Sequence, residues 1–233
     1  MILRAFLLAL GQLGDPRFRK VLGLGVALTL ALLIAASAGV MYLIGWLTGD
    51  STTLPIVGEV TWLGDLLSWS SLVVMMILSV FLMVPVASAI TSMFLDEVAQ
   101  AVEDRHYRGL PPVDPVPFGD ALRDTVNFLG VLIAANLVAI LLYVVFTPFA
   151  MFIFWGLNGF LLGREYIMLA AMRRIGRDGA KRLRRQYAGR VWLAGTLMAI
   201  PLSVPLVNLL VPIVGAATFT HLFHMLNGRL RQY

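Results

Sequence analysis

Four long stretches without Asp, Glu, Lys or Arg constrain this chain more than any other feature of its sequence. They cover residues 21–49, 66–95, 125–163 and 191–228. An α-helix needs about 20 apolar residues to cross the roughly 30 Å hydrocarbon core of a bilayer. Each stretch reaches that length, so the sequence predicts an integral membrane protein.

The composition supports this class and indicates helices. Of the 233 residues, 59% are hydrophobic and only 13% are charged, whereas charged residues make up about 25% of a typical soluble domain. The apolar runs are continuous and rich in Leu, Ala, Val and Met, which is typical of membrane helices. We therefore expect an all-α fold. The chain has no Cys, which excludes disulfides and thiolate catalysis.

The first two stretches predict two long transmembrane helices. Residues 21–49 form the first span and residues 66–95 form the second, which continues as a polar-faced helix to about Tyr107. Residues 50–65 between them contain acidic residues but no Lys or Arg, so we expect a loop on the far side of the membrane. The proline-rich residues 110–118 predict an extended linker.

The other two stretches are interrupted by proline. Thr147-Pro148 divides residues 125–163 into a long arm and a short arm, and prolines divide residues 191–228 in the opposite order (Pro201, Pro205 and Pro212). An arm shorter than about 17 residues does not span a bilayer comfortably. We predict two helical hairpins that penetrate the bilayer only partly. The alternative is four ordinary spans joined by tight turns.

The cations indicate the topology. With two spans and two hairpins, all 18 Lys and Arg fall on one side of the membrane. By the positive-inside rule that side is cytoplasmic, and both termini face it. The net charge of +5 then indicates contact with anionic membrane lipids rather than with nucleic acid. Residues 1–14 are expected to lie along the membrane surface as a short apolar helix.

The junction between this surface helix and the first span is the best candidate site. Pro16 suits the first position of a helix and Asp15 suits its N-cap. Arg17, Arg19 and Lys20 follow, at a helix N-terminus where backbone N–H groups and the helix dipole favour anions. We predict an oxyanion site there. The alternative is that these cations only end the span and set its orientation.

A second candidate region follows the first hairpin. Asn158, Arg164 and Glu165 are candidate residues of a pathway or gate, because ionisable groups close to the membrane are costly and usually functional. The alternative is an interfacial helix stop with a structural ion pair. The cation-rich residues 173–190 predict a cytoplasmic amphipathic helix that binds anionic headgroups.

Groupings that could carry catalysis are lacking. His221 and His224 lie on one helical face, but no third metal ligand has a suitable spacing, so a polar helix end near the membrane surface is favoured. The paired acids at residues 96–97 and 103–104 fit a solvated surface helix. No nucleophile elbow or phosphate-binding loop occurs. We expect neither an enzyme, nor a cofactor, nor a metal site.

Four segments carry a resemblance to a known family: residues 16–20, residues 94–98 with the proline linker after them, residues 158–166, and residues 205–218. Together they resemble the CysZ family of bacterial sulfate permeases, which is similar to the eukaryotic etoposide-induced membrane proteins. The last segment is the most specific, because its Pro, Asn, Pro and Gly spacing is hard to obtain from generic membrane composition. The resemblance extends over about residues 10–228.

The resemblance implies two long transmembrane helices with partly penetrating hairpins, oligomers within the membrane, and sulfate uptake for cysteine synthesis. In that family a Pro-Gly-Leu-Arg-Arg type of junction binds sulfate through backbone N–H groups and both arginines. By position, Arg19 and Lys20 here match the two arginines, and Arg17 and Phe18 match Gly and Leu. The family is also described with antiparallel subunits, whereas the one-sided cations of this chain favour a single orientation.

These observations together predict a single-domain (residues 1–233), multi-pass permease of the inner membrane that forms homo-oligomers. Its substrate is sulfate or a related oxyanion, bound at Arg17, Phe18, Arg19 and Lys20. The alternative is a non-transporting membrane scaffold or stress-related adaptor, the function that the eukaryotic relatives suggest. Residues 173–190 would then be its working surface.

Overall fold

The computed structural model describes residues 1–48, 52–54, 58–60, 94–113 and 118–230. Within them the chain is predominantly helical, which confirms the all-α prediction, and the only strands are a short antiparallel pair, β1 (Thr52–Leu54) and β2 (Gly58–Val60). This pair lies in the segment expected to be a loop. The chain forms two compact units, Met1–Leu22 with Ser92–Tyr233 and Gly23–Thr91. The prediction of a single domain stays a prediction.

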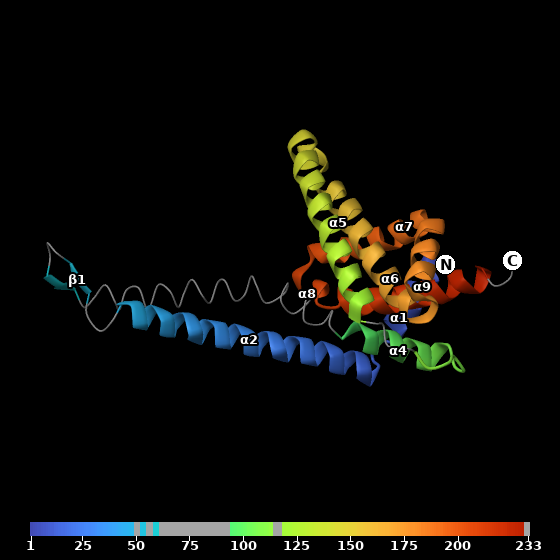
Figure 1. Cartoon of the computed structure of the whole chain (residues 1–233), viewed down its shortest axis with the longest axis horizontal. Helices are drawn as coiled ribbons and strands as arrows, with labels where there is room; N and C mark the ends of the chain where they lie inside the picture. The colour runs from blue at the N-terminus through green and yellow to red at the C-terminus, as the bar shows by residue number, and fades with distance from the viewer. Residues whose placement is uncertain (49–51, 55–57, 61–93, 114–117, 231–233) are drawn as a thin grey trace. The chain divides into compact units, whose positions relative to one another are not determined.

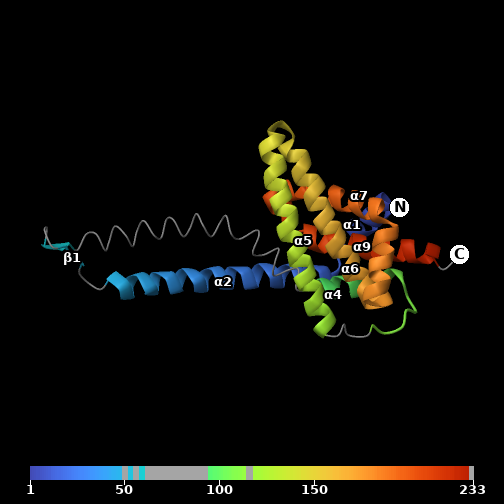
Figure 2. The same cartoon turned by 45° about the horizontal axis from the view of Figure 1, so that its top comes forward.

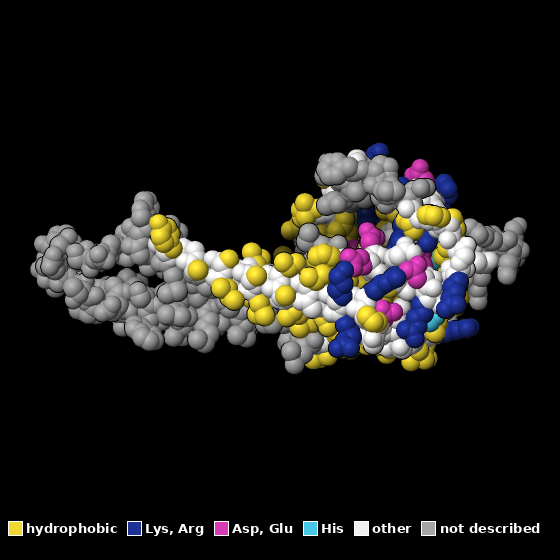
Figure 3. Space-filling view, turned by 90° about the horizontal axis from the view of Figure 1, so that it is seen from below, with side chains coloured by type: hydrophobic (Ala, Val, Ile, Leu, Met, Phe, Trp, Pro, Cys, Tyr) yellow, Lys and Arg dark blue, Asp and Glu magenta, His cyan; other side chains and the backbone are white. Residues whose placement is uncertain are grey.

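Helix α2 (Pro16–Thr48) forms where the sequence predicts the first span. It begins at the expected proline, and Pro16–Ala35 has a mean hydropathy of 1.9, which is apolar enough to cross a membrane. Exposed side chains along it include Leu32, Ile34 and Tyr42. In Figure 3 the part of α2 beyond its charged start carries hydrophobic side chains and no charged ones. The second predicted span, residues 66–95, lies outside the described residues except at its very end.

Helix α9 (Val211–Leu230) is the central helix of the first unit. Every residue from 211 to 223 is buried, and the helix contacts α1 (Ile2–Gly11), α4 (Leu95–His106) and α6 (Ala150–Gln186). A helix that is apolar on nearly all sides must be enclosed by other elements. Its largest fully buried apolar side chains are Ile213, Phe219, Leu222, Phe223 and Leu226.

The first predicted hairpin is present. Helix α5 (Phe118–Val145) turns through η1 (Thr147–Phe149) into α6, and the two helices lie side by side (Figures 1 and 2). The turn is at Thr147-Pro148, as expected. Val126–Val145 of α5 has a mean hydropathy of 2.7, and only 6% of this segment is buried, so the helix presents an apolar surface suited to lipid.

The short arm predicted to end with the uncharged stretch at Gly163 is longer in the structure. Helix α6 continues to Gln186, with a break at Gly176, where φ is 67° and the left-handed conformation suits only glycine well. The helix continues past residue 165 because the next turns carry an apolar face. Tyr166, Ile167 and Ala170 are buried in the core of the first unit, which also contains α9.

The second hairpin has the predicted order of a short arm and a long arm. Helix α7 (Ala188–Ala199) is followed by η2 (Ile200–Ser203), α8 (Pro205–Asn208) and then α9. Pro201 and Pro205 interrupt the helix as expected, whereas Pro212 lies in the first turn of α9. Partial penetration of the bilayer by either hairpin stays a prediction.

Helices α6 and α7 meet backbone to backbone at three glycines. A Cβ added at Gly195 would lie 1.9 Å from the carbonyl oxygen of Gly159, and one added at Gly163 would lie 2.6 Å from that of Val191. Such separations exclude any side chain. Small residues at membrane helix interfaces permit this close approach, and the contact sets the position of α7 on α6.

We expect Gly195→Ala to lower the free energy of unfolding by about 1–3 kcal/mol, because the new methyl group would separate the two helices. Gly189→Ala in the same helix is the matched control. A Cβ there meets nothing within 4 Å, so the control should be neutral or slightly stabilising. Thermal unfolding of both variants in detergent checks this, and equal melting temperatures would contradict the close contact.

Candidate functional site

Asp15 caps helix α2 at the predicted anion site. The Arg17 N–H donates to the Asp15 Oδ1 at 2.9 Å, and the Arg19 N–H donates to the Asp15 carbonyl oxygen at 3.0 Å. The predicted N-cap is therefore confirmed. Phe18 is only 1% exposed and anchors the helix start in the core. Its N–H group has no acceptor among the described residues.

Carboxylates of α4 face the cations of this junction. The Arg17 Nη1 lies 2.5 Å from the Asp104 Oδ2, and the Lys20 Nζ lies 3.7 Å from the Glu97 Oε2. A third pair has the opposite arrangement of charges: the Asp15 Oδ2 of the junction lies 3.9 Å from the Arg105 Nη1 of α4. These ion pairs join two segments that lie far apart in the sequence. Figure 3 shows basic and acidic side chains interspersed on this unit. The hydrogen bond from Arg17 lowers the pKa of Asp104.

The four predicted site residues therefore have different surroundings. Arg17 is tied to α4, Phe18 is buried, and Lys20 is only loosely paired. Arg19 is exposed and has no ion pair with any described residue. Exposed ion pairs contribute about 0–1 kcal/mol each, so they orient the junction more than they stabilise it. The sequence did not reveal the facing carboxylates, because nothing in their spacing relates residue 17 to residue 104.

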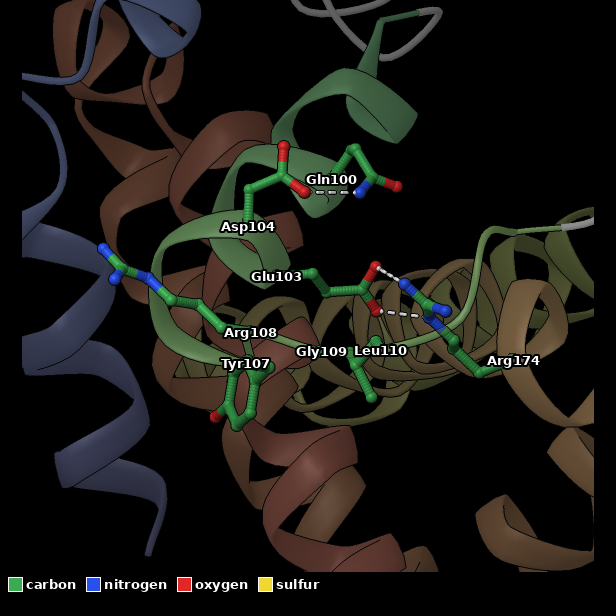
Figure 4. Close-up of a pocket in the computed structure, with 8 residues that line it drawn as sticks. All are labelled: Gln100, Glu103, Asp104, Tyr107, Arg108, Gly109, Leu110 and Arg174. Atoms are coloured by element: carbon green, nitrogen blue, oxygen red, sulfur yellow. Dashed lines mark hydrogen bonds and ion pairs between the residues drawn. The ribbon is translucent and has the colours of Figure 1, made fainter.

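A second polar cluster is buried where α4, α6 and α9 meet. Glu103 is 1% exposed, and its carboxylate accepts hydrogen bonds from the Arg174 Nε at 2.9 Å and the Arg174 Nη2 at 2.6 Å. The His224 Nε2 lies 3.0 Å from the Glu103 Oε1, and the Arg173 Nη2 lies 3.6 Å from the Oε2. Figure 4 shows the Glu103 and Arg174 side chains facing each other.

These contacts shift the pKa of the buried carboxyl group. Burial alone raises the pKa of Glu103, but the hydrogen bonds with His224 and Arg174 and the nearby charges of both arginines lower it to about 2. Glu103 is therefore a permanent anion at neutral pH. Next to it, the Tyr107 hydroxyl lies 2.9 Å from the His221 Nδ1, and the Tyr107 ring stacks on His224 with centroids 4.1 Å apart.

Three sequence interpretations are corrected by this cluster. Glu103 is not solvated, and His221 is fully buried rather than part of a polar helix end. Residues 173–190 do not form one amphipathic helix, because the backbone breaks at Gly176 and the Arg173 and Arg174 side chains are buried. A signal for Glu103 was present: it follows Ala99 by four residues, on the apolar face of α4.

A pocket of about 200 Å³ lies beside the cluster. It is lined by Gln100, Glu103, Asp104, Tyr107, Arg108, Gly109, Leu110 and Arg174. In Figure 4 Arg108 extends away from Glu103, while Glu103 and Arg174 already bind each other. The pocket thus presents charges of both signs, which does not suit a simple anion.

The three candidate gate residues lie along α6. The Asn158 Nδ2 donates to the Phe154 carbonyl oxygen of its own helix at 2.9 Å, and the residue is half-buried. Glu165 is half-buried as well. Arg164 lines a different pocket, together with side chains near the start of α7. No described contact links these three residues to the junction at residues 15–20.

The sequence matches the family described as Sulfate transporter CysZ/Etoposide-induced protein 2.4 over residues 5–212. The chain belongs to this family. Its membership confirms the resemblance seen in the sequence, and it makes the chain a member of a sulfate-transporter-like family of membrane proteins. The match begins in α1 and ends in the first turn of α9, so His221 and His224 lie beyond it. No curated protein matches the chain significantly.

We expect Glu103→Gln to cost about 3–5 kcal/mol of stability, because it leaves two buried arginines without their counter-charge. Glu97→Gln on the same helix is the control, since its 3.7 Å pair with Lys20 is exposed and worth about 0–1 kcal/mol. Unfolding in denaturant at pH 7 measures both.

The effect of Glu103 also has a defined pH dependence. Because its pKa is lowered from 4.5 to about 2, its stabilisation is complete above pH 4.5 and is lost as the pH falls toward 2. The difference in stability between the wild-type protein and Glu103→Gln should shrink over this window. A difference that stays constant from pH 7 to pH 2 would contradict the charged state assigned to Glu103.

Proposed function

We propose that this protein is a multi-pass permease of the inner membrane that carries sulfate or a related oxyanion and supplies sulfate for cysteine synthesis. The observation that carries this proposal is the family match over residues 5–212. Two described helices apolar enough to cross a bilayer support the membrane location. The one-sided distribution of Lys and Arg supports cytoplasmic termini. We further propose that the permease works as a homo-oligomer in contact with membrane lipids.

The anion site in this proposal is the first turn of α2. Arg19 supplies an exposed guanidinium that has no ion pair within the described part of the chain, and Phe18 supplies a backbone N–H group at the positive end of the helix dipole. Lys20 adds a charge whose Nζ is 3.7 Å from Glu97, beyond hydrogen-bond distance. An entering anion can therefore compete for Lys20.

Arg17 has a different role in this proposal. Its guanidinium is held by Asp104, so it positions the junction against α4 rather than meeting the anion first. This accounts for an arginine where the family's junction has glycine. After capture, the anion would pass along the hairpins, where Asn158, Arg164 and Glu165 of α6 are the proposed pathway or gate residues.

Arg19→Ala combined with Lys20→Ala should abolish sulfate uptake, because both side-chain donors are lost. The measurement is labelled-sulfate flux into vesicles reconstituted with the purified protein, with the melting temperature recorded to show that the fold is intact. Arg4→Ala is the control, since Arg4 is an exposed cation of α1 outside the junction, and it should transport normally.

Unchanged flux in the double variant would overturn the site, and no flux by the wild-type protein would overturn transport itself. The second result would favour the scaffold or adaptor hypothesis. The observation that favours the scaffold or adaptor hypothesis is that carboxylates of α4 already face Arg17 and Lys20, as expected of a purely structural junction.

Asp15→Asn provides an independent test of the same site. The asparagine keeps a side-chain oxygen for the Arg17 N–H, but it removes a negative charge from the helix end that should receive the anion. We expect tighter sulfate binding and a lower KM for uptake. Asp96→Asn, an exposed acid in the first turn of α4, is the control. A weaker sulfate affinity in Asp15→Asn would contradict an anion site at residues 18–20.

A further inference from the structure

Arginine side chains and aromatic rings surround a pocket between α6 and the start of α7. Its volume is about 420 Å³. It is lined by Phe160, Arg164, Arg184, Arg185, Ala188, Gly189, Val191 and Trp192. None of these described lining residues is acidic and three are arginines, so the residues around the pocket are basic, while most of the pocket surface itself is apolar. It shares no residue with the junction at the start of α2.

The fold brings these residues together from three places in the chain. Phe160 and Arg164 lie one turn apart on α6. The break at Gly176 redirects the chain, so that Arg184 and Arg185 at the end of α6 reach the same pocket. The first turns of α7 complete the wall, and the backbone contact between Gly163 and Val191 holds this part of α7 against α6.

The aromatic part of the lining is partly open to the surroundings. Trp192 is 50% exposed and Phe160 is 46% exposed. The Trp192 Nε1 donates to the Gly156 carbonyl oxygen at 2.9 Å, which fixes the orientation of the indole. Exposed aromatic rings beside arginines are typical of the membrane–water interface. A free inorganic ion would use the cations but would gain nothing from the rings.

We propose that this pocket binds one anionic phospholipid. Its phosphate accepts hydrogen bonds from Arg185, Arg184 and Arg164, and the start of an acyl chain packs on Phe160 and Trp192. Arg164 and Arg184 already interact within the protein, but a guanidinium offers several N–H donors in a planar fork and can keep one partner while binding a phosphate. Basic pockets between membrane helices bind lipid headgroups in this way.

The site would give the lipid a structural role that is separate from transport. A lipid seated there would join the two parts of α6 on either side of Gly176 to the start of α7. The protein should then be more stable in the presence of an anionic lipid than in neutral detergent, since a ligand that binds only the folded state raises its stability.

The test uses the purified full-length chain in neutral detergent. Phosphatidylglycerol is titrated in, and binding is followed by native mass spectrometry and by the melting temperature. We expect bound phosphatidylglycerol and a raised melting temperature. Phosphatidylcholine in place of phosphatidylglycerol should bind at least about tenfold more weakly, because its headgroup has no net charge. Equal binding of the two lipids would overturn the proposal.

Variants connect the binding to this pocket. Arg184→Gln with Arg185→Gln should weaken phosphatidylglycerol binding about tenfold or more, whereas Arg182→Gln should not. Arg182 is the matched control because it is an exposed arginine of the same helix outside the pocket. Arg185→Gln alone keeps the test decisive if the double variant fails to fold, since Arg185 is exposed. Unchanged binding in Arg185→Gln would overturn the proposal.

Inorganic phosphate separates a lipid site from a site for the free ion. Phosphate titrated without lipid should leave the melting temperature unchanged and should not displace phosphatidylglycerol. Displacement of phosphatidylglycerol by phosphate, or a rise in the melting temperature with phosphate alone that Arg185→Gln abolishes, would assign the pocket to a free oxyanion and overturn the lipid proposal. Because sulfate flux is not measured in any of these experiments, their outcome is independent of the proposed permease function.

Discussion

The buried carboxylate of Glu103 links three helices of the first unit, because its charge must keep its partners. Glu103 comes from α4, Arg173 and Arg174 come from α6, and His224 comes from α9. An unpaired charge in this place would cost several kcal/mol, whereas well-placed hydrogen bonds offset most of that cost. The three helices can therefore meet in few arrangements other than the observed one.

The apolar core extends the same arrangement. Helix α9 is buried over most of its length, and α1, α4 and α6 enclose it. Glycines also allow α7 to approach α6 at backbone distance, and Val191, Ala194 and Met198 of α7 join the same core. In contrast, α5 keeps most of its apolar side chains exposed, which is costly in water and favourable in lipid. The core and the lipid-facing surface thus use different helices of the same unit.

Helix α4 also connects this core to the proposed anion site. One face of the helix carries Glu103 into the cluster, while Glu97 and Asp104 on other faces meet Lys20 and Arg17. The same carboxylates orient the cations and compete with an anion for them. In the proposed permease, this competition would keep binding weak enough for the anion to leave, because exposed pairs of this kind contribute little energy.

The sequence by itself determined the membrane class, the helical fold, the start of α2 at Pro16 with its Asp15 cap, and the turns at Thr147-Pro148 and Pro201. Uncharged runs, caps and prolines are local features, and their consequences act within a few residues. The sequence also identified the family, because each family motif is a contiguous segment of the chain.

Only the tertiary structure decided which charged groups meet. Arg17 and Asp104, or Glu103 and His224, are separated by many residues, and their pairing depends on how α4 and α9 pack. Glu103 was expected to be solvated, although it lies on the apolar face of α4, and the partners that accompany its burial come from other helices. The arginine pocket likewise arises only after the break at Gly176 returns the chain toward Arg164, since sequence distance carries no information on such contacts.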